Sequence, residues 1–313
     1  MNHPRTHHVF GPVPSRRLGR SLGVDLVPFK TCSYDCIYCQ LGPTTCRTVE
    51  RKEWVSMDAV LDELKLKLTS RPDYITLSGS GEPTLHSRLG ELIEHIQAMT
   101  EVPVAVLTNG SLLWQKQVRE ELALADLVMP SLDAPDRDRF EFINRPHPEV
   151  TFERLLEALE ALRREFNGKY WLEVMLLAGY TAIPEAVQRL AQWIRRIQPD
   201  KVQLNTAVRP PAEHYAMAVP PGRLEEFARM FDPRGEVIAE YRGRRARAEA
   251  QGSVEAVLTL LQRRPCTLDD VARGLNLKHS EAVKILEALE AQDKVCSRRH
   301  GESYFYGPIS KVD

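Results

Sequence analysis

Short apolar runs alternate with longer helix-like segments along the first two thirds of the chain. The short runs predict β-strands, and the longer segments between them predict helices. Strand and helix in alternation are typical of parallel sheets whose crossovers are helical. The expected strands are residues 24–28, 73–78, 103–108, 127–132, 171–177 and 201–205. The expected helices are residues 56–69, 86–99, 114–124, 151–166 and 184–197.

The number of these alternations bounds the architecture. Six strands with crossover helices are too few to close an eight-stranded barrel, and they suit an open one. The sequence therefore predicts an α/β fold, a partial (βα)6 barrel over residues 1–240. Two helix starts support the boundaries, because Ser56 and Thr151 are good N-cap residues and Glu153 adds an acid in a first turn.

The last part of the chain, residues 253–313, follows a different rhythm. Three helices and a β-hairpin are expected there, which resembles a winged helix. Their expected bounds are residues 253–263, 267–274 and 279–291 for the helices and Lys294 to Ser297 against Ser303 to Tyr306 for the hairpin. A basic segment of small residues, 241–252, is expected to link the two domains.

The third helix of this second domain has the wrong charge for DNA. It sets three acids against Lys284, and a net negative helix opposes phosphate binding. The acids are Glu281, Glu287 and Glu290. The domain is therefore expected to dock substrate or protein, or to dimerise, rather than to regulate genes.

Composition narrows the class of protein. A length of 313 residues suits one large and one small domain, and a formal net charge of −1 gives no sign of a polyanionic partner. No apolar run approaches the ~20 residues of a membrane span, and the first residues lack the apolar core of a signal peptide. Six cysteines, three of them clustered, fit a reducing compartment, so a cytoplasmic protein without a membrane partner is expected.

The densest chemistry lies at residues 29–40, directly after the first apolar run. Cys32, Cys36 and Cys39 follow the spacing C-x3-C-x2-C. Three thiolates on a short loop can hold three irons of a 4Fe–4S cube and leave the fourth iron open for a ligand. A structural zinc site is the alternative, but it normally takes paired cysteines, and only Cys46 offers a fourth ligand. A disulfide would leave one of the three cysteines idle.

Polar residues recur on one face of successive expected strands. Because loops converge at the carboxyl ends of parallel strands and buried polar groups need partners, these residues predict a lined cavity. The polar residues are Thr76, Ser78, Asn109, Ser131, Asp133, Glu173, Gln203 and Asn205. The apolar residues expected on the same strand faces are Ala105, Leu107, Met129, Met175 and Leu177. Upstream, residues 9–23 are expected to form a loop in which Arg16, Arg17 or Arg20 contacts an anionic part of a substrate, unless the loop is simply solvated.

At these residues the chain resembles the radical S-adenosylmethionine (SAM) superfamily. The cysteine spacing matches, and Gly81-Glu82-Pro83 resembles the family's GGEP motif, with Ser80 replacing a glycine. The resemblance implies a 4Fe–4S cluster on the three cysteines and SAM chelated by the open iron through its amino and carboxylate groups. It further implies reductive cleavage of SAM to methionine and a 5′-deoxyadenosyl radical, with a reductant such as flavodoxin or ferredoxin as partner.

The same resemblance implies which residues contact SAM. Glu82 corresponds to the residue that binds the methionine amino group, and Ser131 and Asp133 to those that bind the ribose hydroxyls. Glu173 and Asn205 are included only because they lie in the right strands. The full implied set is Gly81, Glu82, Asn109, Ser131, Asp133, Glu173 and Asn205.

Phrases outside these motifs, among them residues 204–211, resemble the Fe–S oxidoreductases related to wyosine synthase, which rebuilds a methylated guanine in transfer RNA. That enzyme has a second cluster near its N-terminus, whereas no cysteine precedes Cys32 here, which argues against its pyruvate-based chemistry. The substrate is left open among modified RNA, a peptide and a small metabolite. A redox-sensing regulator that binds nucleic acid is the competing hypothesis. Every SAM-like motif lies before residue 210, so the second domain is expected to be dispensable for SAM cleavage.

Overall fold

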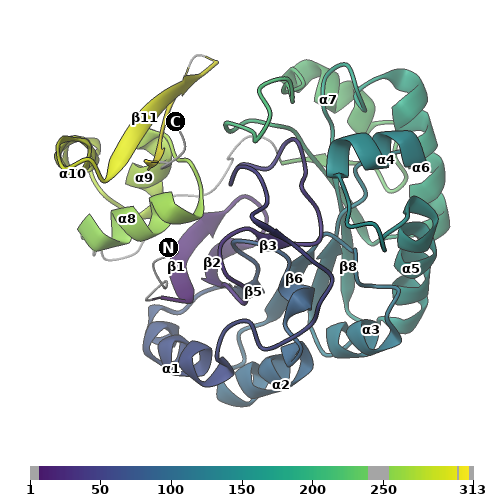
Figure 1. Ribbon diagram of the computed structural model, residues 1–313, viewed down its shortest axis with the longest axis horizontal. Coiled ribbons are helices and arrows are strands. Elements are labelled where there is room, and N and C mark those ends of the chain that lie inside the picture. The colour runs from purple at the N-terminus through teal and green to yellow at the C-terminus, as the bar shows by residue number, and fades with distance from the viewer. Residues whose placement is uncertain (1–6, 239–253, 302, 310–313) are drawn as a thin grey trace.

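The computed structural model describes residues 7–238, 254–301 and 303–309 and is built on one eight-stranded sheet (Figure 1). The strand order is β1-β2-β5-β6-β7-β8-β9-β10. β1 and β2 are antiparallel, and every later neighbouring pair is parallel. The strands are β1 (Val9–Ser15), β2 (Gly19–Val24), β5 (Tyr74–Leu77), β6 (Val104–Thr108), β7 (Leu127–Pro130), β8 (Lys169–Met175), β9 (Lys201–Asn205) and β10 (Glu236–Val237). The expected open α/β barrel is confirmed.

Helices cover the outside of this curved sheet (Figure 1). None of them, within the ranges described, combines the length and apolar composition needed to cross a bilayer. The helices are α1 (Met57–Lys67), α2 (Leu89–Met99), α3 (Lys116–Leu122), α4 (Arg137–Asn144), α5 (Phe152–Glu165), α6 (Pro184–Ile197) and α7 (Pro221–Ala228).

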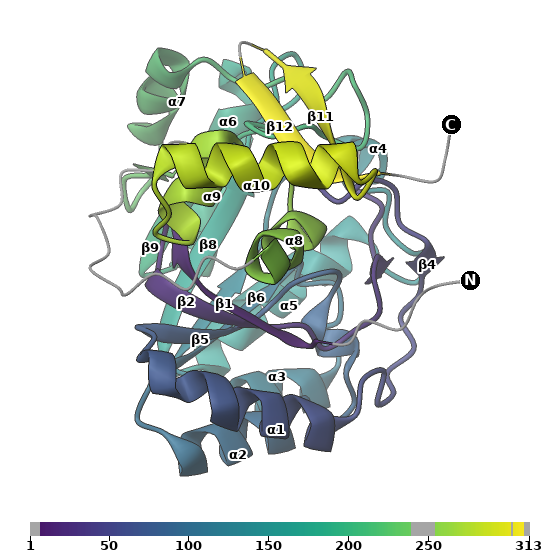
Figure 2. The same cartoon turned by 90° about the vertical axis from the view of Figure 1, so that its left-hand side faces the viewer.

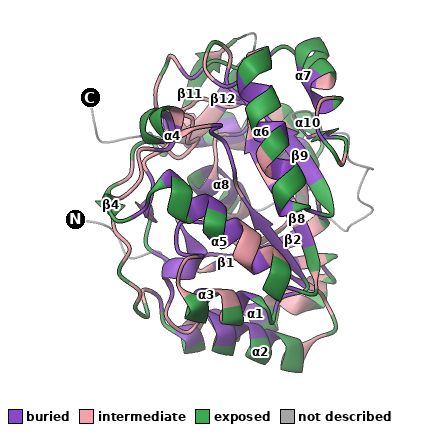
Figure 3. Ribbon diagram, turned by 90° about the vertical axis from the view of Figure 1, so that its right-hand side faces the viewer, coloured by how far each residue is buried: buried purple, intermediate pink, exposed green. Residues whose placement is uncertain are grey.

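The outer helices show why the hydrophobic pattern of the sequence predicts them. α5 turns an apolar stripe inward and a charged face outward, as the burial colours show (Figure 3). The Thr151 hydroxyl accepts a hydrogen bond from the backbone N–H of Arg154 and so caps this helix as expected. The expected Ser56 cap is also present, where the hydroxyl accepts from the N–H of Ala59 at the start of α1.

The expected loop at residues 9–23 is wrong, because this segment forms the β1–β2 hairpin. The first parallel strand is accordingly Gly19–Val24 and not residues 24–28. The register of the hairpin shifts between Phe10 and Val13, and the segment contains glycines and prolines that usually indicate turns. Those residues hide the period-two pattern. α4 and α7 were also not expected.

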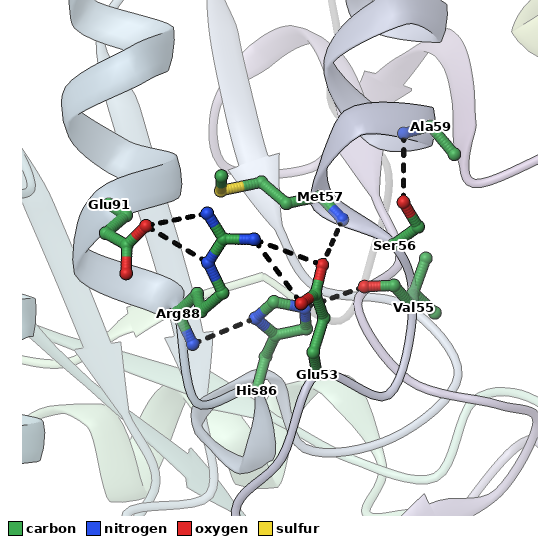
Figure 4. Close-up of polar contacts among 8 residues, drawn as sticks. All are labelled: Glu53, Val55, Ser56, Met57, Ala59, His86, Arg88 and Glu91. Carbon is green, nitrogen blue, oxygen red and sulfur yellow. Dashed lines mark hydrogen bonds and ion pairs between the residues drawn. The ribbon is translucent and has the colours of Figure 1, made fainter.

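A long segment after the cysteine loop is tied to the loop after β5. Figure 4 shows its centre, the fully buried His86, whose Nε2 lies 2.9 Å from the carbonyl oxygen of Val55. His86 Nδ1 accepts from the N–H of Arg88, so Nε2 carries the proton that Val55 accepts. The Arg88 guanidinium joins the carboxylates of Glu53 and Glu91. These bonds hold in place the segments that lead into α1 and α2.

The second domain has the expected elements. It contains three helices and a hairpin in which Val295 pairs with Pro308 and His300 with Ser303. The elements are α8 (Val254–Arg263), α9 (Leu268–Gly274), α10 (His279–Ala291), β11 (Val295–His300) and β12 (Ser303–Pro308). The expected linker, residues 241–252, lies outside the described residues.

This second domain packs on the edge of the barrel rather than standing apart. α8 and α9 lie against β1 (Figure 2). At the end of α8, the guanidinium of Arg263 forms an ion pair with the carboxylate of Asp25, and the two side chains are only 6% and 2% exposed. The same carboxylate accepts bonds from the hydroxyl and N–H of Ser80. Through Asp25, the second domain therefore supports the loop after β5.

Replacing Arg263 with methionine is expected to lower the free energy of unfolding by about 3 kcal/mol, because it leaves the buried Asp25 carboxylate without its counter-ion. Chemical denaturation would measure the change. Arg273→Met is the matched control, since its pair with Asp269 is exposed and such pairs contribute about 0–1 kcal/mol. Equal losses in the two variants would contradict a supporting role for the buried pair.

Candidate active site

A cavity of about 430 Å³ opens among the strands of the barrel. Nine of the residues that the strand alternation placed on one face line it. They are Thr76, Ser78, Leu107, Asn109, Met129, Ser131, Glu173, Met175 and Asn205. The loop after β5 adds residues 79–82. Four residues expected on that face, namely Ala105, Asp133, Leu177 and Gln203, do not line the cavity.

The cysteine loop borders this cavity. It begins with β3 (Thr31–Cys32), which pairs with β4 (Cys46–Arg47), and its cysteines are free thiols. Cys32 and Cys39 line the cavity, and Cys36 lies half-buried behind them.

Each of the three sulfur atoms lies within reach of one nitrogen donor. The Lys30 ammonium is 3.0 Å from Cys39 Sγ. The amide nitrogens of Asn109 and Asn144 lie 3.5 Å from the sulfurs of Cys32 and Cys36, respectively. These donors come from three different parts of the chain, and hydrogen bonds to sulfur stabilise its anionic form.

The loop after β5 packs directly on the cysteine loop. The Lys30 N–H donates to the carbonyl of Ser80, and the Glu82 N–H to that of Thr31. A Cβ atom at Gly81 would lie 1.8 Å from the carbonyl oxygen of Thr31, so only glycine permits this approach. The Gly-Glu-Pro sequence therefore has a packing role whatever it binds.

The Glu82 carboxylate lines the cavity but is already held by the protein. Its Oε1 accepts bonds from the hydroxyls of Thr84 and Thr108 and from the Thr84 N–H, and its Oε2 accepts one from the Asn109 N–H. Burial raises the pKa of Glu82, while these bonds lower it. Oε2 has the greater capacity left for a cation in the cavity.

Asn109 links the third strand to the cysteine loop. Its Nδ2 donates to Ser33 Oγ at 2.9 Å as well as approaching Cys32, and its Oδ1 accepts from the N–H of Ser111. Ser131 lies one strand further along, where it bridges to Glu173 of β8. Both side chains line the cavity as expected.

Asp133 differs from the expectation, because its carboxylate turns away from the cavity. It accepts hydrogen bonds from the hydroxyl of Tyr38, from Asn144 Nδ2 at 3.0 Å and from the N–H of Met175 at 2.9 Å. Burial raises the pKa of Asp133 to about 6. The carboxylate thus ties the cysteine loop to α4 and β8, with two protein donors on Oδ2 and one on Oδ1.

Glu173 and Asn205 meet the β1–β2 turn. Glu173 Oε1 accepts from the Arg17 guanidinium and from Asn205 Nδ2 at 3.0 Å. Arg16 Nη1 lies 3.4 Å from Asn205 Oδ1. Arg20 instead donates to the carbonyls of Ser70 and Arg71, outside the cavity. Of the three arginines considered, only the first two reach the site.

The chain matches a known protein family over most of the residues that form this site. A family model described as the radical SAM superfamily matches residues 26–194, which is more than half of the chain. The chain belongs to the radical SAM superfamily. The matched span contains the cysteine loop and the Gly-Glu-Pro loop.

The chain is also similar to individual proteins, one of which has a name that refers to SAM. The radical SAM protein is 35% identical over 235 residues to a UPF0026 protein of Methanocaldococcus jannaschii, covering 74% of this chain and 72% of that one. It is 29% identical over 107 residues to the S-adenosyl-L-methionine-dependent tRNA 4-demethylwyosine synthase of Pyrococcus horikoshii, covering 33% and 30%. It is 38% identical over 296 residues to a protein named GTPase Obg from Brachyspira hyodysenteriae, covering 93% of this chain but only 44% of that protein.

A solved structure confirms the fold. The crystal structure of a radical SAM methyltransferase from Sphaerobacter thermophilus superposes with a TM-score of 0.53 at 17% identity, over 69% of this chain and 66% of that one. Because the chain belongs to the radical SAM superfamily, it is an enzyme whose cofactors are a 4Fe–4S cluster and SAM.

The thiol environment fits such a cluster. Burial raises the pKa of Cys32 to about 12 and that of Cys36 well above its ordinary value. Buried thiols of this kind become thiolates when a bound metal compensates their charge. Within the described ranges, no three His, Cys, Asp or Glu side chains are positioned to share a single metal ion. In a cube-shaped cluster each thiolate instead binds a different iron.

Four polar residues at the site were not anticipated. Lys30 and Asn144 contact the cysteines, and Arg209 and Arg264 line the cavity. Lys30 is adjacent to the cysteine motif and could have been suspected on that ground. Asn144 lies in the unexpected helix α4, and Arg264 lies in the domain that was expected to be separate.

Proposed function

We propose that Cys32, Cys36 and Cys39 ligate the 4Fe–4S cluster and that Gly81, Glu82, Asn109 and Ser131 form the SAM site beside it. The observation that carries this proposal is the cysteine loop itself, where Cys32 and Cys39 border the cavity, Cys36 lies next to them, and each of the three sulfurs faces a nitrogen donor. When bound, the reduced cluster and SAM supply a 5′-deoxyadenosyl radical that abstracts hydrogen from the substrate.

The protein's own residues position the cofactor. Glu82 Oε2 accepts the ammonium group of SAM, because Oε1 already has three protein donors and Oε2 has one. The Ser131 hydroxyl, on the neighbouring strand end, bonds a ribose hydroxyl. Asp133 acts indirectly, because it holds Tyr38 of the cysteine loop and Asn144 of α4 together.

Glu173 and Asn205 have a different role from the one the resemblance implied. Because the Arg17 guanidinium already pairs with Glu173, and Asn205 joins the same network, these two residues shape the far wall of the cavity. They orient substrate rather than SAM. The protein acts in the cytoplasm with a flavodoxin- or ferredoxin-type reductant, on a substrate that enters this wall.

Anaerobic reconstitution tests the proposal. The full chain, reduced with dithionite and supplied with SAM, is expected to release methionine and 5′-deoxyadenosine, because slow cleavage without substrate requires only the cluster and SAM. Glu82→Gln is expected to reduce the affinity for SAM about tenfold, as expected for loss of one charge-assisted bond. An iron-loaded protein that neither binds nor cleaves SAM would reject the proposal and favour the redox-sensing regulator.

Replacing Lys30 with methionine is expected to make the cluster harder to reduce. A unit positive charge beside a partly buried site stabilises the added electron by about 1–3 kcal/mol, or roughly 50–130 mV for one electron. An EPR-monitored redox titration measures this shift, with iron content determined on the same sample. Lys65→Met, on the exposed face of α1, is the control. An unchanged potential at full iron content would contradict the electrostatic role of Lys30.

A further inference from the structure

Four arginines line the cavity, and we call them the arginine cluster. Arg16 and Arg17 come from the β1–β2 turn, Arg209 follows β9, and Arg264 follows α8 of the second domain. Their separation in sequence shows that the fold brings them together and that no single basic segment does so.

Few of the residues that line the cavity carry a negative charge. Of the described residues that line the cavity, the carboxylates are Glu82 and Glu173. Glu82 lies at the cysteine loop, and Glu173 is paired with Arg17. Asp270, which does not line the cavity, adds a second carboxylate next to Arg209. Four guanidinium groups therefore face two carboxylates, which leaves a local surplus of about two positive charges when all are protonated.

The hydrogen bonds of the arginine cluster are incomplete. Arg209 Nη1 donates to Gln40 Oε1 at 3.1 Å, and Arg17 Nη2 to Glu173. The Nε atoms of Arg17, Arg209 and Arg264, however, are buried and find no acceptor among the described residues. A buried N–H without an acceptor costs about 1–3 kcal/mol, so three such groups in one place point to an acceptor that comes with a ligand.

Charge crowding adds to this cost. Burial, and then the neighbouring Arg209 and Arg17, lowers the pKa of Arg16 to about 9. Burial, and then Arg264, lowers the pKa of Arg209 to about 10. Guanidinium groups resist deprotonation, so at neutral pH the four positive charges remain and repel one another. A multiply charged anion would relieve both the repulsion and the missing acceptors.

We propose that the arginine cluster binds a phosphate ester or diphosphate group of a small substrate. A single carboxylate would leave about half of the surplus charge uncompensated, whereas a phosphate group carries about two charges and several acceptor oxygens that match the forked guanidinium. The four arginines line a cavity of about 430 Å³, which favours a small phosphorylated molecule over the backbone of a nucleic acid. The proposal rests on the proposed function, since the phosphate belongs to the molecule from which hydrogen is abstracted.

Inorganic pyrophosphate is the probe for this site. Isothermal titration of the full, cluster-loaded chain under anaerobic conditions is expected to show binding that Arg209→Gln and Arg264→Gln each weaken about tenfold, the loss of one charge-assisted contact. Arg195→Gln is the matched control, because Arg195 is exposed on α6. Arg209→Lys keeps the charge and loses the fork, and is expected to bind with intermediate affinity.

Several results would overturn the proposal. They are no binding of pyrophosphate to the wild-type chain, equal binding by the cluster variants and Arg195→Gln, or binding of a short oligoribonucleotide that depends on the arginines when pyrophosphate does not bind. SAM affinity is measured in the same variants, and a parallel loss of SAM and pyrophosphate affinity would assign the arginines to SAM instead. Melting curves show that each variant is folded, and the wild-type titration decides the case alone if one is not.

The same samples separate this proposal from the proposed function. If the wild-type chain cleaves SAM but does not bind pyrophosphate, the proposed function stands and the phosphate site is rejected. If the wild-type chain binds pyrophosphate through Arg209 and Arg264 but does not cleave SAM, the anion site stands. Its assignment to the substrate of a radical reaction is then rejected.

Discussion

The chain with Cys32, Cys36 and Cys39 all changed to alanine is expected to bind no iron, whereas the wild-type chain, purified without oxygen, is expected to be brown and to carry about four iron and four sulfide. The reason is that the three sulfurs are the cluster's proposed protein ligands. Iron and sulfide analysis with visible absorption spectroscopy measures the loss, and SAM cleavage should disappear with it.

Cys46 supplies the control. It lies on β4, seven residues after Cys39, where it pairs with Thr31 rather than with a cysteine of the motif, and it is exposed. Cys46→Ala is therefore expected to keep its iron. A triple variant with full iron content would mean that the cluster lies elsewhere, and loss of iron from Cys46→Ala would return attention to a four-cysteine site.

Asp133→Ala is expected to lower the free energy of unfolding by about 4 kcal/mol, roughly 10 °C in melting temperature, and to loosen the cluster. The change leaves Tyr38, Asn144 and the Met175 N–H without the carboxylate that they now share. Because Asn144 also contacts Cys36, iron is expected to be lost more readily on exposure to a chelator. Thermal melting and the rate of chelation measure the two effects.

The exposed Asp138 of α4 provides a matched control, and Asp138→Ala is expected to change neither quantity. The family resemblance implies a different outcome for Asp133, namely weaker SAM binding through a lost ribose contact. A variant that melts like the wild type, keeps its iron and binds SAM at least tenfold more weakly would restore the ribose role and contradict the positioning role.

Much of the barrel could be predicted because its strands are short, apolar and followed by helices with clear caps. The strands at residues 104–108 and 201–205 are within one residue of expectation. The β1–β2 hairpin could not be predicted, because glycines and prolines that usually end strands lie inside it. Its pairing with the sheet depends on contacts that are distant in sequence.

The residues of the site likewise include some that the sequence predicts and some that it does not. Alternation correctly brought Asn109, Ser131 and Glu173 to one cavity, since strand geometry dictates the face of a side chain. It failed for Asp133, which lies three residues past the end of β7, whereas Asn109 and Ser131 come directly after their strands, where the period-two rule still applies. No local pattern marks Arg264, because its place at the cavity depends on how the second domain packs.

The pairing of Arg263 with Asp25 also sets the order of assembly during synthesis. The two residues lie 238 positions apart, and the next residue, Arg264, completes the cavity wall. At about 5–20 residues per second, a ribosome needs roughly 12–48 seconds to pass from one partner to the other. For most of that interval the cysteine loop has been synthesised, whereas Arg264, the last residue of the cavity wall, has not. A cluster inserted early would face open solvent, so cofactor loading after release of the finished chain is the safer order for this protein.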